Sequence, residues 1–176
     1  QHYPPYKVAE TFNTLASLAP DRVDLGVGKS PGGFPMSTAA LQLARDHARW
    51  PAFQAHVKDL DACLDRRFER GAPPVAVAAP LPTVSPQRYV LGGSVDSAIM
   101  AAELGWHFVF AGQINGAPEL IERSLDAFAK HGGKGRPILA CLALVTETKE
   151  RAESLVSGIR TLRLTLPDGQ SVNLMN

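Results

Sequence analysis

The sequence has few cysteines and no long apolar run, and both shortages exclude whole classes of protein. Two cysteines occur in 176 residues, Cys63 and Cys141. Their separation fits no metal site, so both are expected to be buried thiols of a reducing compartment, the cytoplasm. No apolar stretch approaches the ~18 residues of a membrane-spanning helix, and no charged segment followed by an apolar one opens the chain. We therefore expect neither membrane association nor secretion.

The sequence also lacks a surplus of charge of either sign. Lysine plus arginine number 18 and aspartate plus glutamate 17, which leaves a formal net charge of +1 at pH 7. A nucleic-acid-binding surface needs a basic excess, so no nucleic-acid partner is expected, and a neutral ligand or one local charged patch is favoured. A chain of this length forms one domain. It begins at Gln1 without an initiator methionine, which we interpret as a fragment or a processed chain.

Alternating strand and helix patterns fill most of the chain. Apolar runs predict strands at 23–28, 75–79, 89–91, 107–111 and 138–145. Helical spacing predicts helices at 5–19, 37–48, 51–68, 94–104 and 118–130, and another around 152–159. Repeated βα units indicate a parallel sheet covered on both faces, either an open doubly wound sheet or part of a (β/α) barrel. At the end, alternation around Pro167-Asp168-Gly169 predicts a β-hairpin, an appendix over 160–175 to a single domain over 1–176.

The helix predicted over 51–68 is the most periodic in the chain. Its apolar stripe is Phe53, Val57, Leu60, Leu64 and Phe68. Its opposite face is predicted to be solvated and carries Gln54, Lys58, Asp61, Asp65 and Arg66. His47 and His56 have no accompanying carboxylate pattern, so we interpret them as surface histidines and predict no metal site.

The stretch RYVLGGSVDSAIMAAELG, residues 88–105, has the pattern of a strand, a tight glycine turn and a helix. Ser94 opens the helix, and Gly105 closes it as a C-terminal glycine does. Glycines in such a turn let backbone N–H groups approach a ligand, and a helix N-terminus favours an anion, typically phosphate. The hydroxyls of Ser94 and Ser97, one helical turn apart, can both point at that anion. The alternative is that Ser94 is only an N-cap and the turn binds nothing.

A second candidate follows the strand at 23–28. Lys29 opens the loop KSPGG, and loops at the carboxyl ends of strands are where α/β proteins bind ligands. Lys29 is therefore a candidate phosphate ligand, with a solvated lysine as the alternative.

Three blocks of sequence carry a resemblance to a known family. They are YPPYKVAETFNTLASLAPDRVDLGVGKSPG from Tyr3, YVLGGSVDSAIMAAELGWHFVFAG from Tyr89, and TETKERAESL, which ends at Leu155. In this order they resemble the bacterial luciferase-like family of flavin-dependent monooxygenases, most closely the single-component luciferase-like oxidoreductases. The resemblance implies a (β/α)8 TIM barrel that binds reduced flavin mononucleotide (FMN) and uses O2 to oxidise an aldehyde or another small organic substrate.

The resemblance also implies ligand roles for residues of this chain. The family's cofactor contacts fall on Lys29, Gly93, Ser94, Ser97, Val27 and Gly28. The first four would hold the phosphate, and the last two would lie near the flavin ring. Arginine is commoner in the family at the Lys29 position. The lysine ammonium therefore replaces a guanidinium that could donate two hydrogen bonds to the phosphate. The family's histidine and acidic residues near the ring belong to a part absent from this sequence, so no catalytic residue is assigned.

The chain is too short for a whole barrel. Eight βα units need roughly 240 residues, whereas this chain has 176. By resemblance it corresponds to about strands 4 to 7 of eight, an incomplete α/β TIM-barrel-like fold with the C-terminal hairpin appended. Its open edges can be closed by another copy, by a separate chain with the missing half, or within a longer enzyme, and we favour the longer enzyme. The resemblance and the open edges both argue against a lone monomer, so a homo-oligomer is expected. A small open sheet with the hairpin along one edge is the alternative.

The function that follows is a luciferase-like, FMN-dependent monooxygenase. Its partners would be a small-molecule substrate, O2 and a separate flavin reductase. Two alternatives stay open: a truncated, non-catalytic homologue that serves as a flavin-binding or dimerisation module, and a relative that uses the deazaflavin cofactor F420.

Overall fold

A computed structural model describes residues 2–29, 35–42, 52–65, 76–114, 116–158, 161–165 and 171–175. The helices are α1 (Pro5–Leu18), α2 (Pro35–Leu41), α3 (Phe53–Leu64), α4 (Val95–Leu104), α5 (Pro118–Lys130) and α6 (Lys149–Ser157). The strands are β1 (Asp24–Gly28), β2 (Gln87–Gly92), β3 (His107–Ala111), β4 (Ile138–Ala140), β5 (Thr161–Thr165) and β6 (Ser171–Met175). In this part of the chain, no helix combines the length and the apolar composition needed to cross a membrane.

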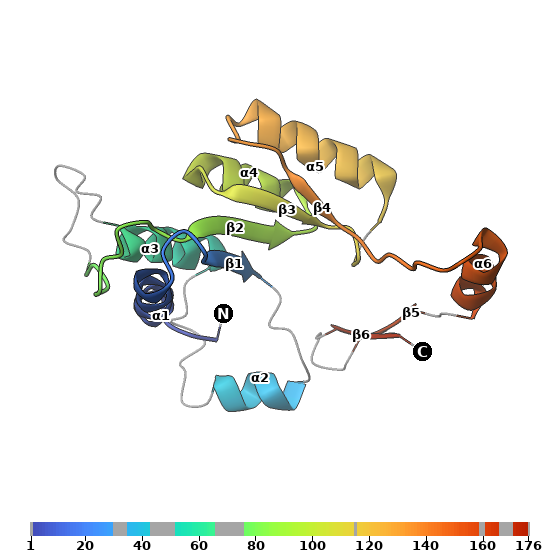
Figure 1. Ribbon diagram of the computed structural model, residues 1–176, viewed down its shortest axis with the longest axis horizontal. Helices are drawn as coiled ribbons and strands as arrows, with labels where there is room; N and C mark the ends of the chain where they lie inside the picture. Colours follow the sequence, from blue (N-terminus) through green and yellow to red (C-terminus); the bar gives the residue numbers. More distant parts are fainter. Residues whose placement is uncertain are drawn as a thin grey trace.

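The first four strands form one sheet in the order β1-β2-β3-β4, and every pair is parallel. Parallel neighbours need a long crossover between them, which is why helices separate these strands. β5 and β6 form a separate antiparallel hairpin in which Leu162 pairs with Leu174. The hairpin and α6 stand apart from the sheet in Figure 1. The predicted parallel sheet and hairpin are both confirmed, while the numbering of these strands within a barrel stays a prediction.

Helices cover one face of the sheet. α1 packs on α3, α3 meets α4, and α4 packs on α5 and on the strands β2 and β3. The strand side chains beneath these helices are Leu25, Val90, Phe108 and Phe110, which are at most 1% exposed. The ring of Phe108 stacks on that of Phe128 in α5, with centroids 5.8 Å apart. This face therefore holds the hydrophobic core.

The other face of the sheet, which we call the uncovered face, carries Gln87, Tyr89, Leu91, His107, Val109 and Ile138. Leu91 and Ile138 are 37% and 47% exposed although both are large and apolar. Tyr89 stacks on His107 with ring centroids 4.9 Å apart, and Nε2 of His107 lies 3.3 Å from Oε1 of Gln87. The sequence predicted helices on both faces of the sheet, whereas the described helices cover only one face.

The two helices after β2 and β3 begin and end where the sequence predicts. Ser94 is the N-cap of α4, and its Oγ accepts a hydrogen bond from the N–H of Ser97. Gly105 ends α4 in the left-handed conformation, with φ of 69°, which a glycine adopts without strain. Pro118 opens α5, and His131 ends it. These boundaries were predictable because capping depends on residues next to each other in sequence.

The prediction for the strand over 75–79 is wrong. Residues 76–79 are described, and they form no strand. The segment instead lies against α1 and α3, where the N–H of Ala78 donates to the carbonyl of Cys63 at 2.9 Å. Its small side chains suit this close packing, and Cys63 itself is buried as predicted.

The prediction for the strand over 138–145 is too long. β4 ends at Ala140, and residues 141–145 are exposed. Cys141, which was expected to be buried, is therefore exposed. An apolar run is buried only where another layer covers it, and no described element covers this one.

Two helices also differ from the prediction. α2 begins at Pro35, two residues before the predicted start at Ser37, and residues 43–48 of the predicted helix lie outside the described part. In α1, Leu15 is 45% exposed although it is large and apolar. Asn13 is fully buried instead, because its Nδ2 donates to the carbonyls of Ala78 and Leu64 at 3.0 and 3.4 Å.

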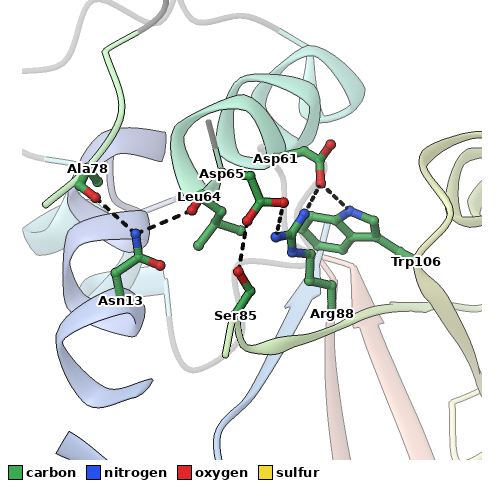
Figure 2. Close-up of polar contacts among 8 residues, drawn as sticks. All are labelled: Asn13, Asp61, Leu64, Asp65, Ala78, Ser85, Arg88 and Trp106. Atoms are coloured by element: carbon green, nitrogen blue, oxygen red, sulfur yellow. Dashed lines mark hydrogen bonds and ion pairs between the residues drawn. The ribbon is translucent and has the colours of Figure 1, made fainter. Parts of the chain in front are cut away.

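A network of polar side chains joins α3 to the amino ends of β2 and β3 (Figure 2). We call it the base network: Asp61, Asp65, Ser85, Arg88 and Trp106. Oδ1 of Asp61 accepts from Nη1 of Arg88 at 2.6 Å and from Nε1 of Trp106 at 2.7 Å. Asp65 binds Nη2 of Arg88 at 2.5 Å and accepts from the Ser85 hydroxyl at 2.8 Å.

The base network corrects part of the prediction of a solvated polar face on α3, because Gln54 and Lys58 are exposed as predicted and Asp61 is buried. Asp61 is 8% exposed and Arg88 9%. A buried charge is tolerated only when it is paired and hydrogen-bonded, and both conditions hold here. The apolar stripe on the other side of α3 is confirmed, since Val57, Leu60 and Leu64 are buried, while Phe68 and Arg66 lie outside the described residues.

Candidate functional site

The carboxyl ends of β1 and β2 lie side by side. Gly28 pairs with Leu91 in the parallel register, so Lys29 and the turn that begins at Gly92 leave adjacent strands at the same level. Neighbouring strands are ~4.8 Å apart, and Lys29 is exposed, so its flexible side chain can reach over the turn. Ligands of α/β proteins bind at this edge of the sheet. The structure thus brings together the two phosphate candidates that the sequence pattern singled out.

Gly92 allows α4 to begin directly against the end of β2. A Cβ at Gly92 would lie 2.3 Å from the Cβ of Ser97 and 2.4 Å from its Oγ. The first turn of α4 therefore rests on strand backbone, which fixes where the helix N-terminus points. Gly93 is different, because nothing lies within 4 Å of its Cβ position. Gly92 serves the packing, and Gly93 leaves open space next to the turn.

Ser94 and Ser97 present a pair of hydroxyls at the start of α4. Their Oγ atoms lie 3.0 Å apart, and both residues are half-buried. The Ser94 Oγ caps the helix by accepting the N–H of Ser97 at 3.3 Å. The N-cap role is therefore confirmed, and it does not compete with a ligand. Capping uses the oxygen as an acceptor, and of the two hydroxyl protons only one is used within the pair, so the other can be donated to a ligand oxygen.

Asp96 adds a negative charge to the same helical turn. It is exposed and lies in the first turn of α4. A carboxylate at this place stabilises the helix by its favourable interaction with the helix macrodipole. The same negative charge repels a phosphate that approaches the N-terminal amides. An anion therefore binds here only if its attraction to Lys29, the hydroxyls and the backbone N–H groups exceeds its repulsion by Asp96.

Val27 and Gly28, the two predicted neighbours of a flavin ring, lie on opposite sides of the sheet. Val27 is half-buried and packs against the core on the helix side. Gly28, next along the strand, lacks a side chain on the uncovered face, and a Cβ there would lie 3.5 Å from the carbonyl oxygen of Leu91. The row level with Gly28 continues through Leu91, Val109 and Ile138. Gly28 thus borders an apolar row, while Val27 can reach a ring only through its backbone.

The described histidine and cysteine residues that the sequence singled out do not lie at this edge of the sheet. His56, interpreted from the sequence as a surface residue, is 9% exposed on α3, and His47 lies outside the described residues. Burial raises the pKa of the Cys63 thiol, and the charge of Asp59 raises it further, so Cys63 is no nucleophile near neutral pH. Within the described ranges, no three His, Cys, Asp or Glu side chains are grouped to hold a metal ion.

Sequence reasoning missed the base network. Arg88 lies two residues before Val90, and alternation along a strand places both side chains on the same, covered face. An arginine in that position requires a buried acidic partner, so the existence of a network was predictable from this signal. Its members were not, because Asp61 and Trp106 are brought to Arg88 only by folding.

Comparison with known proteins identifies the family. A family model described as luciferase-like monooxygenase matches residues 1–173. The chain belongs to the luciferase-like monooxygenase family. The resemblance carried by the three sequence blocks is thereby confirmed.

Individual relatives of this luciferase-like chain are longer than it is. An N-acetyl-S-alkylcysteine monooxygenase of Bacillus subtilis (strain 168) is 40% identical over 99% of this chain and 53% of its own length. The crystal structure of apo-MsnO8 is similar with a TM-score of 0.62 and 33% identity, over 78% of this chain and 41% of that one. An F420-dependent secondary alcohol dehydrogenase in complex with an F420-acetone adduct, with a TM-score of 0.51 and 20% identity over 75% of this chain and 42% of its own, shares the fold. The chain spans about half the length of the curated relatives it matches.

Proposed function

We propose that this chain carries the cofactor phosphate site of a luciferase-like monooxygenase that oxidises a small organic substrate with O2 and reduced FMN. Membership of the luciferase-like monooxygenase family supports the proposed oxidation of a small substrate. The observation that carries the phosphate assignment is the β2–α4 turn: Gly92 lets α4 start against the sheet, and Ser94 and Ser97 place two hydroxyls next to the open space at Gly93.

The residues at this edge fit a flavin phosphate. A phosphate only accepts hydrogen bonds, and this edge supplies donors: the N-terminal amides of α4, one free hydroxyl proton and the ammonium of Lys29. Asp96 opposes them by its charge. Riboflavin lacks the phosphate and would use none of these donors, which makes it a matched control ligand.

The flavin, when bound, supplies the oxygen chemistry, and the protein's own share is to bind, orient and exclude water. In this chain Lys29 and the β2–α4 turn would hold the phosphate. Gly28 would leave room for the ring at the edge of the sheet, and the row Leu91, Val109 and Ile138 would give an apolar wall to ring or substrate.

The substrate is proposed as a small thioether or aldehyde. The relative with 40% identity is named for N-acetyl-S-alkylcysteine, so an N-acetyl-S-alkylcysteine is the first compound to test. Long-chain aldehydes are second, because the bacterial luciferase resemblance implies them. A flavin reductase is proposed to supply reduced cofactor and can be replaced in the assay by chemically reduced FMN.

The test supplies the purified chain with reduced FMN, O2 and each candidate substrate, and product is followed by mass spectrometry. Oxygen-dependent product is the expected result. A protein that turns yellow with FMN and oxidises neither substrate would favour the flavin-binding module. Oxidation of the aldehyde with oxidised F420 as the hydride acceptor, and none with reduced FMN and O2, would show that F420 is the cofactor. Failure to bind either cofactor would contradict the proposal.

A further inference from the structure

The loop after β3 adds a further group of residues to the carboxyl edge of the sheet. In the parallel register, Gly92 of β2 pairs with Phe110, and Ala111 pairs with Ala140 of β4. Residues 112–114 therefore leave the sheet between the β2–α4 turn and the end of β4. Neighbouring strands are ~4.8 Å apart, so a long side chain of this loop can reach a ligand that extends from the β2–α4 turn.

Backbone contacts fix this loop against β4. The N–H of Gln113 donates to the carbonyl of Ala140 at 3.1 Å, and the N–H of Ile114 donates to the carbonyl of Ala111 at 3.0 Å. A Cβ at Gly112 would lie 2.8 Å from the same oxygen of Ala140, so the glycine permits this close approach. The position of Gln113 on the edge is thus determined by main-chain contacts, and its side chain does not hold the loop.

The carboxamide of Gln113 remains available to a ligand. The residue is exposed, and among the residues that the structure describes its side chain has no hydrogen-bond partner. Ile114, the next residue, is 59% exposed. The loop therefore presents a neutral group that both donates and accepts hydrogen bonds, beside an apolar side chain.

The proposed ligands of this edge differ in what they offer a carboxamide. The flavin phosphate is an anion, and its charged donor, Lys29, lies on the β1 side of the β2–α4 turn, away from β3. An aldehyde only accepts hydrogen bonds. The acetamide of an N-acetyl-S-alkylcysteine is neutral and, like the carboxamide, both donates and accepts. The chemistry of Gln113 therefore fits the acetylated thioether best.

We propose that Gln113 is a specificity residue that binds the acetamide of an N-acetyl-S-alkylcysteine substrate. This inference rests on the proposed function, because it assigns a substrate contact within the same site. A site that hydrogen-bonds a polar group of its substrate discriminates against the analogue that lacks this group. The loop after β3 would thus select the acetylated thioether over unacetylated thioethers and aldehydes.

The experiment compares two ligands that differ only in the acetamide. Isothermal titration calorimetry measures the binding of N-acetyl-S-methylcysteine and of 3-(methylthio)propanoate to the chain, with and without oxidised FMN. The wild type should bind the acetylated compound roughly 5–10-fold more tightly, the effect of about one hydrogen bond. Gln113→Leu should abolish this preference by weakening the acetylated compound alone. Gln54→Leu, at an exposed position of α3, is the matched control and should retain it.

A preference that Gln113→Leu abolishes and Gln54→Leu retains supports the proposal. A wild type that binds both thioethers equally overturns it, and so does one that binds neither, with FMN or without. Equal weakening of both compounds by Gln113→Leu would also overturn it. FMN is titrated separately: a loss of FMN affinity in Gln113→Leu would assign this residue to the cofactor and contradict the proposal. A chain that discriminates between the thioethers and binds no FMN refutes the cofactor site and leaves the assignment of Gln113 standing.

Discussion

The two ends of β2 are held by different chemistry. At the amino end, Arg88 and Trp106 are bound by the carboxylates of α3, and the charges are buried against one another. At the carboxyl end, α4 is held by the close contact of Gly92 with Ser97, and the donors beside it remain open to a ligand. We infer that the two ends have different roles: the buried ion pairs at the amino end stabilise the fold, and the carboxyl end is the proposed phosphate site, the arrangement found in (β/α) barrels generally. Substitutions at the two ends should therefore fail in different ways.

The largest effect is expected from Asp61→Leu at the amino end. Among the described residues, the change leaves Nε1 of Trp106 without this acceptor and leaves Arg88 one carboxylate partner, Asp65, in a buried site. Breaking a buried ion pair in this way should lower the free energy of unfolding by about 3–5 kcal/mol, measured by urea denaturation. The control Asp59→Leu, on an exposed position of the same helix, should stay within about 0.5 kcal/mol of the wild type. Equal losses for the two variants would show that the base network does not stabilise the fold.

Gly92→Ala should affect both the stability of the fold and the binding of FMN. Its Cβ would collide with Ser97, so α4 must shift, at a cost of about 1–3 kcal/mol in the free energy of unfolding and with weaker FMN binding. Gly93→Ala separates the two effects, because its Cβ meets open space. We expect unchanged stability and weaker FMN binding for this variant. If Gly93→Ala binds FMN as the wild type does, the phosphate does not lie beside Gly93.

Lys29→Ala should act on binding alone, whereas Ser94→Ala also removes the N-cap of α4 and should lower the free energy of unfolding by about 0.5–2 kcal/mol. Each removes a donor to the phosphate and should weaken FMN binding by about 1–3 kcal/mol, while riboflavin binding changes little. Titration of both ligands by fluorescence quenching measures this, with the exposed Lys58→Ala on α3 as the charge-matched control. The phosphate assignment fails if both ligands are weakened equally.

Asp96→Asn should produce the smallest change, in the opposite direction. It removes a negative charge from the first turn of α4, so FMN should bind about 0.3–1 kcal/mol more tightly at low salt, and the gain should shrink as salt is added. Riboflavin affinity should stay constant. Weaker FMN binding would mean that the anion does not approach this turn.

The same division explains what the sequence could predict. The β2–α4 turn was predictable because its signals are local: two glycines, a serine cap and a closing glycine lie within one short stretch. The base network was not, since Asp61 and Arg88 are 27 residues apart and the exposed side of α3 is defined only by what packs on it. The prediction of a strand over residues 141–145 was wrong for the same reason, because an apolar run does not reveal whether another layer of the protein covers it.

The central claim, a phosphate site at the carboxyl end of β2, is tested most directly by the dissociation constants of FMN and riboflavin for the unaltered chain. The account predicts that FMN binds at least ~10-fold more tightly, a difference of about 1.4 kcal/mol, and that inorganic phosphate competes with FMN and not with riboflavin. Equal affinities with no competition by phosphate would contradict it.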